Sequence, residues 1–125
     1  MWETGPEGPR MTGPRGREAA EKERQRQMLD EFLSDATRDV ERMRALIAEL
    51  EAGDGTAWGR VQNTAHNLAA RAMALKLGVL NACARELEQL TNERLNGAPL
   101  DKFFMQCVAS AIETLALEIA ALKQA

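Results

Sequence analysis

The sequence predicts an all-α protein, specifically an antiparallel up-down-up-down four-helix bundle. Apolar residues recur at steps of three and four along four successive stretches, which gives each stretch one apolar face. The composition is 45% hydrophobic but only 4% aromatic and contains no Tyr, so the core must be built from helix-favouring aliphatic side chains. Short glycine-containing connections make neighbouring helices antiparallel, and a bundle buries all four faces.

The first predicted helix carries one continuous apolar stripe. Its members are Leu29, Leu33, Ala36, Val40, Met43, Ile47 and Leu50. The preceding mixed-charge run, Arg17–Gln27, is expected to extend this helix into solvent. Residues 1–16 hold most of the prolines and lack apolar periodicity, which predicts a disordered tail. Residues 17–125 are expected to form a single bundle domain.

The other three helices follow the same pattern. The second is expected over residues 56–77, with Thr56 as its N-cap after the Gly53-Asp54-Gly55 turn. Its stripe is Trp58, Val61, Ala65, Leu68, Ala72 and Leu75. The third stripe is Leu80, Cys83, Leu87 and Leu90, with Arg94 leaving the core. After an Asn96–Pro99 turn, the fourth is Phe104, Val108, Ala111, Leu115, Glu118 or Ile119, and Leu122. The near-heptad spacing also permits a long coiled-coil hairpin that dimerises.

Several classes of function are disfavoured by composition. No apolar run approaches the roughly 20 residues that span a bilayer, and the first residues lack a secretory-signal pattern, so we expect a cytoplasmic protein. A net charge of −3 argues against general nucleic-acid binding. Cys83, Cys107 and one histidine form no metal-ligand set, and both cysteines are expected to be buried hydrophobes. The sequence contains no glycine-rich phosphate loop, so no ATP site is expected.

His66, the single histidine, is the candidate for chemistry. At 100° per residue it lies about 140° from Val61 and so outside the apolar stripe of its helix. Neighbouring positions on its face form a candidate docking surface: Gln62, Asn63, Ala69, Ala70 and Met73. These side chains leave the imidazole accessible. A lone surface histidine is otherwise usually a solvated residue without a role.

The charge of this helix is also distinctive. Between residues 56 and 77 it carries Arg60, Arg71 and Lys76 and no acidic residue. A basic helix attracts an acidic donor and stabilises a transferred phosphate. An exposed neutral imidazole is a competent nucleophile towards an acyl phosphate near neutral pH.

The run from His66 to Glu88 resembles the histidine-containing phosphotransfer domains. Seven residues match that family's pattern without gaps: His66, Leu68, Ala72, Leu75, Leu80, Leu87 and Glu88. Three positions depart from it. The family usually has Lys where this chain has Ala69, Gly where it has Ala70, and Gly near the end of the histidine helix where it has Lys76.

The resemblance implies a phosphorelay protein in which His66 accepts a phosphoryl group from a receiver-domain phospho-aspartate and passes it to another. It implies response-regulator receiver domains or a hybrid histidine kinase as partners, with Mg²⁺ supplied by the receiver and no cofactor of its own. Lys76, and less favourably Arg71, are the candidates to stabilise the phosphate. Such a chain is a phosphotransfer intermediate rather than a self-sufficient enzyme. We expect a monomer that binds neither nucleic acid nor membrane, with a dimer as the alternative.

The sequence is also compatible with two other functions. The absence of Lys and Gly after the histidine also suits a degenerate phosphotransfer domain, a helical adaptor that docks signalling partners without accepting phosphate. The long first helix and its charged extension suit a dimeric helical scaffold.

Overall fold

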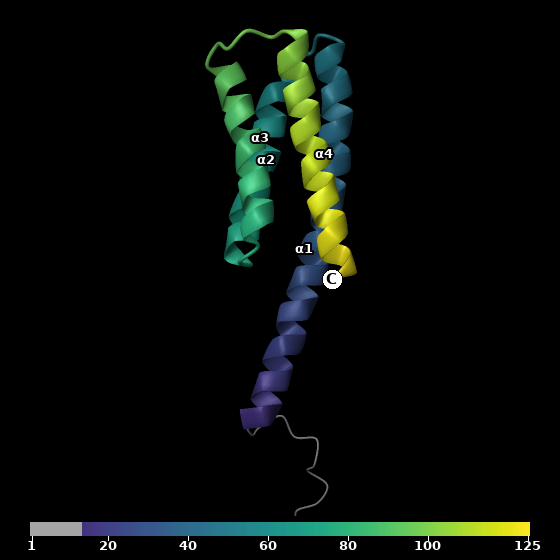
Figure 1. The fold of residues 1–125 in the computed structure, drawn as a ribbon, viewed down its shortest axis with the longest axis vertical. Helices are drawn as coiled ribbons and strands as arrows, with labels where there is room; N and C mark the ends of the chain where they lie inside the picture. The colour runs from purple at the N-terminus through teal and green to yellow at the C-terminus, as the bar shows by residue number, and fades with distance from the viewer. Residues whose placement is uncertain (1–13) are drawn as a thin grey trace, which may run out of the picture. The chain divides into compact units, whose positions relative to one another are not determined.

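The computed structural model describes residues 14–125, which form four helices (Figure 1). These are α1 (Pro14–Glu51), α2 (Ala57–Ala74), α3 (Gly78–Leu95) and α4 (Lys102–Gln124). Residues 1–13 of the predicted tail lie outside the described part, and helix α1 already includes residues 14–16. The prediction of an all-α four-helix bundle is confirmed.

The chain divides into two compact units at Glu31 and Phe32. In the first unit, α1 exposes nearly all of its side chains between Arg17 and Gln27, as predicted for a mixed-charge run. Ion pairs of i,i+3 spacing join Arg24 to Glu21 and Arg26 to Glu23. Such exposed pairs contribute little individually, so the helical propensity of the residues themselves accounts for most of the local order.

The second unit, Phe32–Ala125, contains the bundle core. Its largest fully buried side chains are Phe32, Met43, Val61, Leu68, Leu80, Leu87, Thr91, Val108, Ile112 and Leu115. The predicted stripes supply most of this core. Phe32 and Leu46 are buried although they were outside the predicted stripe, whereas Ile47 and Cys83 are only half-buried. A helix with two neighbours in a bundle buries a wider face than a single stripe describes.

Two glycines end helices where the backbone turns left-handed. Gly53 after α1 and Gly97 after α3 have φ values of 100° and 102°, which glycine adopts without steric cost. In each case the two amides after the last helical turn bond back to helix carbonyls. Both helices therefore end in a satisfied turn, and successive helices run antiparallel (Figure 1).

The helix starts differ from one another. Asp101 caps α4, because its carboxylate accepts a hydrogen bond from the Phe104 amide at 2.7 Å. Thr56 occupies the predicted N-cap position of α2 but makes no side-chain cap bond. Its hydroxyl instead donates to Asp54 at 2.6 Å, so the prediction of Thr56 as the capping side chain is wrong.

A bidentate ion pair joins α1 to α4 within the second unit. The Arg44 guanidinium donates to both carboxylate oxygens of Glu113, at 2.9 and 2.8 Å. These hydrogen bonds lower the pKa of Glu113 below its ordinary value of 4.5.

Helix α4 is long and apolar enough to cross a membrane by length and composition alone. Its buried residues, however, pack into the bundle: Val108, Ala111, Ile112, Leu115 and Ile119. A core helix of a bundle has the same composition, so this property alone does not distinguish the two.

Candidate functional site

His66 lies on α2 with its side chain 57% exposed, as the helical geometry predicts. Its Nδ1 atom lies 2.6 Å from Oε2 of Glu88, on the facing helix α3. An ionised carboxylate only accepts hydrogen bonds, so the imidazole donates through Nδ1. The proton on Nδ1 leaves Nε2 with a free lone pair. In the neutral imidazole, a hydrogen bond from Nδ1 to Glu88 favours the tautomer whose lone pair lies on the exposed Nε2.

Glu88 is itself held in place by its surroundings. Its side chain is only 14% exposed, and one turn along α3 the buried Thr91 donates its hydroxyl to the Glu88 carbonyl at 2.7 Å. From the sequence, Glu88 was identified only as one of the positions that match the family pattern, and no role was predicted for it. Its contact with His66 joins two helices, and the periodicity of a single helix does not reveal such a contact.

A second contact fixes the same two helices beside His66. The Asn81 amide of α3 donates to the carbonyl of Ala69 on α2 at 2.8 Å. Ala69 is 2% exposed, because α3 packs over it. Ala69 therefore offers no surface to a partner, contrary to its expected place in the docking surface.

The remaining residues of the expected docking surface are accessible to different degrees. Asn63, Ala70 and Met73 are exposed, and Gln62 is half-buried. Met73 is an exposed large hydrophobic side chain, 56% accessible, on the helix of His66. The small Ala70 side chain follows the histidine by one turn, so the imidazole is not shielded from that direction.

Two of the basic residues of α2 form ion pairs with acidic residues of α1. Arg60 pairs with Glu49 of α1 at 2.9 Å. Arg71 pairs with Asp35 of α1 at 3.0 Å and lies over the Phe32 ring, 5.1 Å from its centroid. Hydrogen bonds from Arg71 and Arg38 lower the pKa of Asp35. Arg60 and Arg71 thus neutralise acidic residues of α1, and Arg71 does not face His66.

Lys76 lies beyond the end of α2, in the left-handed conformation with φ 61°. The helix rises about 12 Å from His66 to Ala74, which exceeds the length of an extended lysine side chain. A contact with a phosphate on His66 would need the reach of both side chains, so the role of Lys76 stays a prediction.

The two cysteines lie between α3 and α4, apart from the contact of His66 with Glu88. Cys83 and Cys107 are free and half-buried, and both line a groove of about 330 Å³ between α3 and α4. Burial, with Glu118 and Glu86 nearby, raises the pKa of the Cys83 thiol. Residues 14–125 contain no cluster of three or more His, Cys, Asp or Glu suited to a metal ion.

Comparison with known proteins agrees with the geometry. Residues 27–125 match the Hpt domain family. No curated protein matches the chain. Hpt domains interact with receiver domains and histidine kinases in phosphorelays, and the histidine they use lies on the second helix of their bundle, as His66 does here. The chain therefore belongs to the histidine-containing phosphotransfer (Hpt) domains of two-component signalling.

Proposed function

We propose that His66 is the phosphoryl-accepting residue, which takes a phosphoryl group from the phospho-aspartate of a receiver domain and passes it to another receiver. One observation carries this proposal: an exposed imidazole whose Nδ1 is held by Glu88 at 2.6 Å. The proposal includes a cytoplasmic location, since its partners are receiver domains and hybrid kinases.

The transfer follows from the state of the two ring nitrogens. The Nε2 lone pair forms a bond to phosphorus while the bond from phosphorus to the aspartate oxygen breaks, and the carboxylate leaves with the electron pair. The imidazole becomes positively charged because Nδ1 keeps its proton. The Glu88 carboxylate stabilises this charge through the same hydrogen bond and accepts the proton as the phosphoimidazole becomes neutral.

The partner completes the site. The receiver supplies Mg²⁺ and the acyl phosphate, so this chain needs only a preoriented nucleophile and a surface for docking. Ala70 and Met73 lie beside the imidazole and are exposed. They are our candidates, with Gln62 and Asn63, for the surface that a receiver covers.

The test uses the fact that the chain has a single histidine. Purified receivers carrying a ³²P-labelled phospho-aspartate are mixed with the chain in Mg²⁺, and label on the chain is tested for stability. We expect base-stable, acid-labile label that His66→Gln abolishes. Asn67→Ala, one position along α2 and also exposed, serves as the matched control and should accept label normally.

A helical adaptor gives a different result. If a panel of receivers binds the chain measurably but transfers no label, the phosphotransfer proposal is wrong. The chain is then a docking module that retains the Hpt fold without its chemistry.

A further inference from the structure

A phosphoryl group on His66 brings negative charge, but the residue three positions later on the same helix carries no positive charge to offset it. Family members usually have Lys at this position, whereas this chain has Ala69, which is 2% exposed. Of the basic residues on α2, Arg60 and Arg71 are paired with acidic residues of α1. A cation that this chain itself supplies to the phosphate would therefore come from another element.

Helix α3 presents one flank to α2, as two contacts establish. Asn81 bonds the Ala69 carbonyl at 2.8 Å, and Glu88 bonds His66 at 2.6 Å. Arg85 lies between these two residues in sequence. At 100° per residue it lies about 40° around the helix from Asn81 and about 60° from Glu88.

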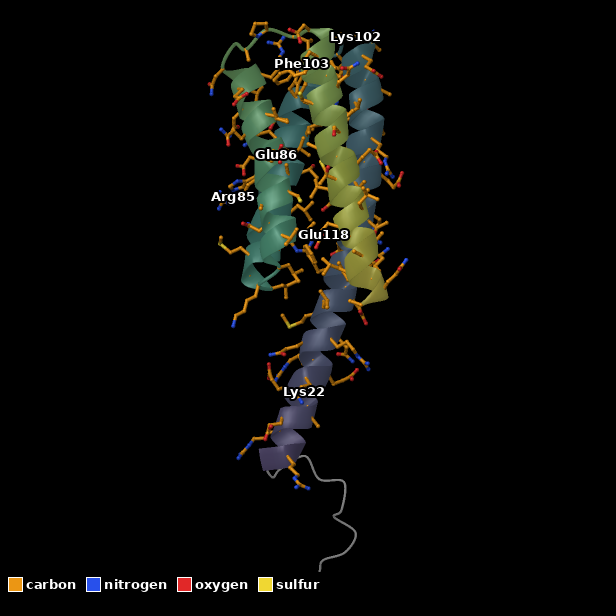
Figure 2. All side chains as sticks on the ribbon, in the orientation of Figure 1. Lys22, Arg85, Glu86, Lys102, Phe103 and Glu118 are labelled. Atoms are coloured by element: carbon orange, nitrogen blue, oxygen red, sulfur yellow. The ribbon has the colours of Figure 1, made fainter. Side chains whose placement is uncertain are left out.

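Arg85 therefore lies at a level between Ala69 and His66, beside the contact of α3 with α2. Its side chain is exposed and points away from α4 (Figure 2). Within residues 14–125 it forms no ion pair. Glu88, one turn away, does not neutralise it, because that carboxylate is directed to His66.

We propose that Arg85 of α3 binds the phosphoryl oxygens on His66 and replaces the missing lysine of α2. This inference rests on the proposed function of His66. A guanidinium suits this position, because its planar donors match phosphate oxygens and its long side chain extends from the facing helix. The phosphate then lies between Arg85 and the imidazole, with Glu88 on the opposite ring nitrogen.

The test phosphorylates the chain without a partner. Phosphoramidate, a small phosphoryl donor, is used to modify His66, and the pKa of the phosphoryl group is measured by ³¹P NMR titration at low ionic strength. A nearby cation favours the doubly charged phosphate, so Arg85→Ala should raise this pKa by about 0.5 unit. Arg85→Lys should show a smaller rise.

Lys76→Ala is the matched control, because it removes the same charge from the end of α2 and should leave the pKa unchanged. In transfer from a phospho-receiver, Arg85→Ala should lower the rate about ten-fold, with the helical circular dichroism unaltered.

Equal pKa values for wild type and Arg85→Ala overturn this inference, as does an equal rise for Lys76→Ala. In that case phosphorylation of His66 itself still supports the proposed function. A wild-type chain that accepts no phosphoryl group from phosphoramidate or from any receiver overturns both.

Discussion

The proposed phosphoryl transfer depends on how the Glu88 carboxylate restrains the His66 imidazole. Glu88 is mostly buried and its backbone is tied to Thr91, so it holds the ring of His66 in one orientation. An exposed histidine without such a partner rotates freely and exchanges between tautomers. In the proposed function, this contact orients His66 as the nucleophile.

Removing Glu88 should slow phosphoryl transfer without unfolding the chain. We expect Glu88→Ala to lower the rate about ten- to a hundred-fold, since a hydrogen bond to a charged group contributes roughly 1.5–3 kcal/mol. Glu88→Gln keeps an acceptor oxygen but not the charge, so its rate should be intermediate. Initial rates of label transfer from a phospho-receiver measure both.

Glu86→Ala provides the control for that series. Glu86 also lies on α3 but lines the groove towards α4, so its removal should leave transfer unchanged. Equal losses of transfer rate in Glu86→Ala and Glu88→Ala would show that Glu88 acts through the net charge of α3 and not through its contact with the His66 ring.

At the residue scale, the sequence predicted the exposure of His66 correctly but not which residues surround it. The exposure of His66 follows from its angle on one helix, and the structure agrees. Ala69 is buried because α3 covers it, and the angle of a residue on its own helix does not say where a second helix packs. The pairing of His66 with Glu88 and the position of Arg85 depend on the same missing information.

At the scale of elements, two basic residues of α2 pair with acidic residues of α1, and an unusual residue follows the end of the helix. Lys76 occupies the left-handed position after the helix, with φ 61°, and its amide and that of Leu77 bond back to Met73 and Ala72. Gly53 and Gly97 occupy the corresponding positions after α1 and α3. A side chain at this position is strained where glycine is not.

Replacing Lys76 with glycine should therefore stabilise the protein. We expect Lys76→Gly to raise the free energy of unfolding by about 1 kcal/mol, as measured by urea denaturation. Lys76→Ala keeps the strain and should show no comparable gain. Phosphoryl transfer should be unchanged in both variants. A loss of transfer in both would show that the Lys76 side chain takes part in phosphoryl transfer.

At the scale of the whole molecule, four amphipathic stripes predicted the bundle because each apolar face requires burial. Helix α2 was expected over residues 56–77 but spans Ala57–Ala74, because helix ends are decided by local hydrogen bonds such as that of Thr56 with Asp54. The burial of Phe32 and Leu46 depends on a second neighbouring helix. Ion pairs between helices, such as Arg44 with Glu113, depend on that packing too.

That pair makes part of the stability dependent on pH. Because the folded protein lowers the pKa of Glu113 below 4.5, its contribution is present above that value and is lost as the pH falls through the lowered pKa. Glu113→Gln should therefore lose less stability than wild type between pH 7 and pH 3. The difference should be under about 1 kcal/mol, because the pair is exposed.

Urea denaturation at several pH values measures this difference. Glu51→Gln, an exposed carboxylate at the end of α1, is the control and should follow the wild-type profile. Parallel profiles for wild type and Glu113→Gln would contradict the assignment.

The central claim is tested most directly by locating the phosphoryl group. After transfer from a phospho-receiver, the chain is digested at neutral or basic pH and its peptides are analysed by mass spectrometry. We predict one added phosphoryl group on the peptide that contains His66, joined to the imidazole nitrogen and absent from His66→Gln. An unmodified His66 after incubation with receivers that bind the chain, or a phosphoryl group on any other residue, would contradict the claim.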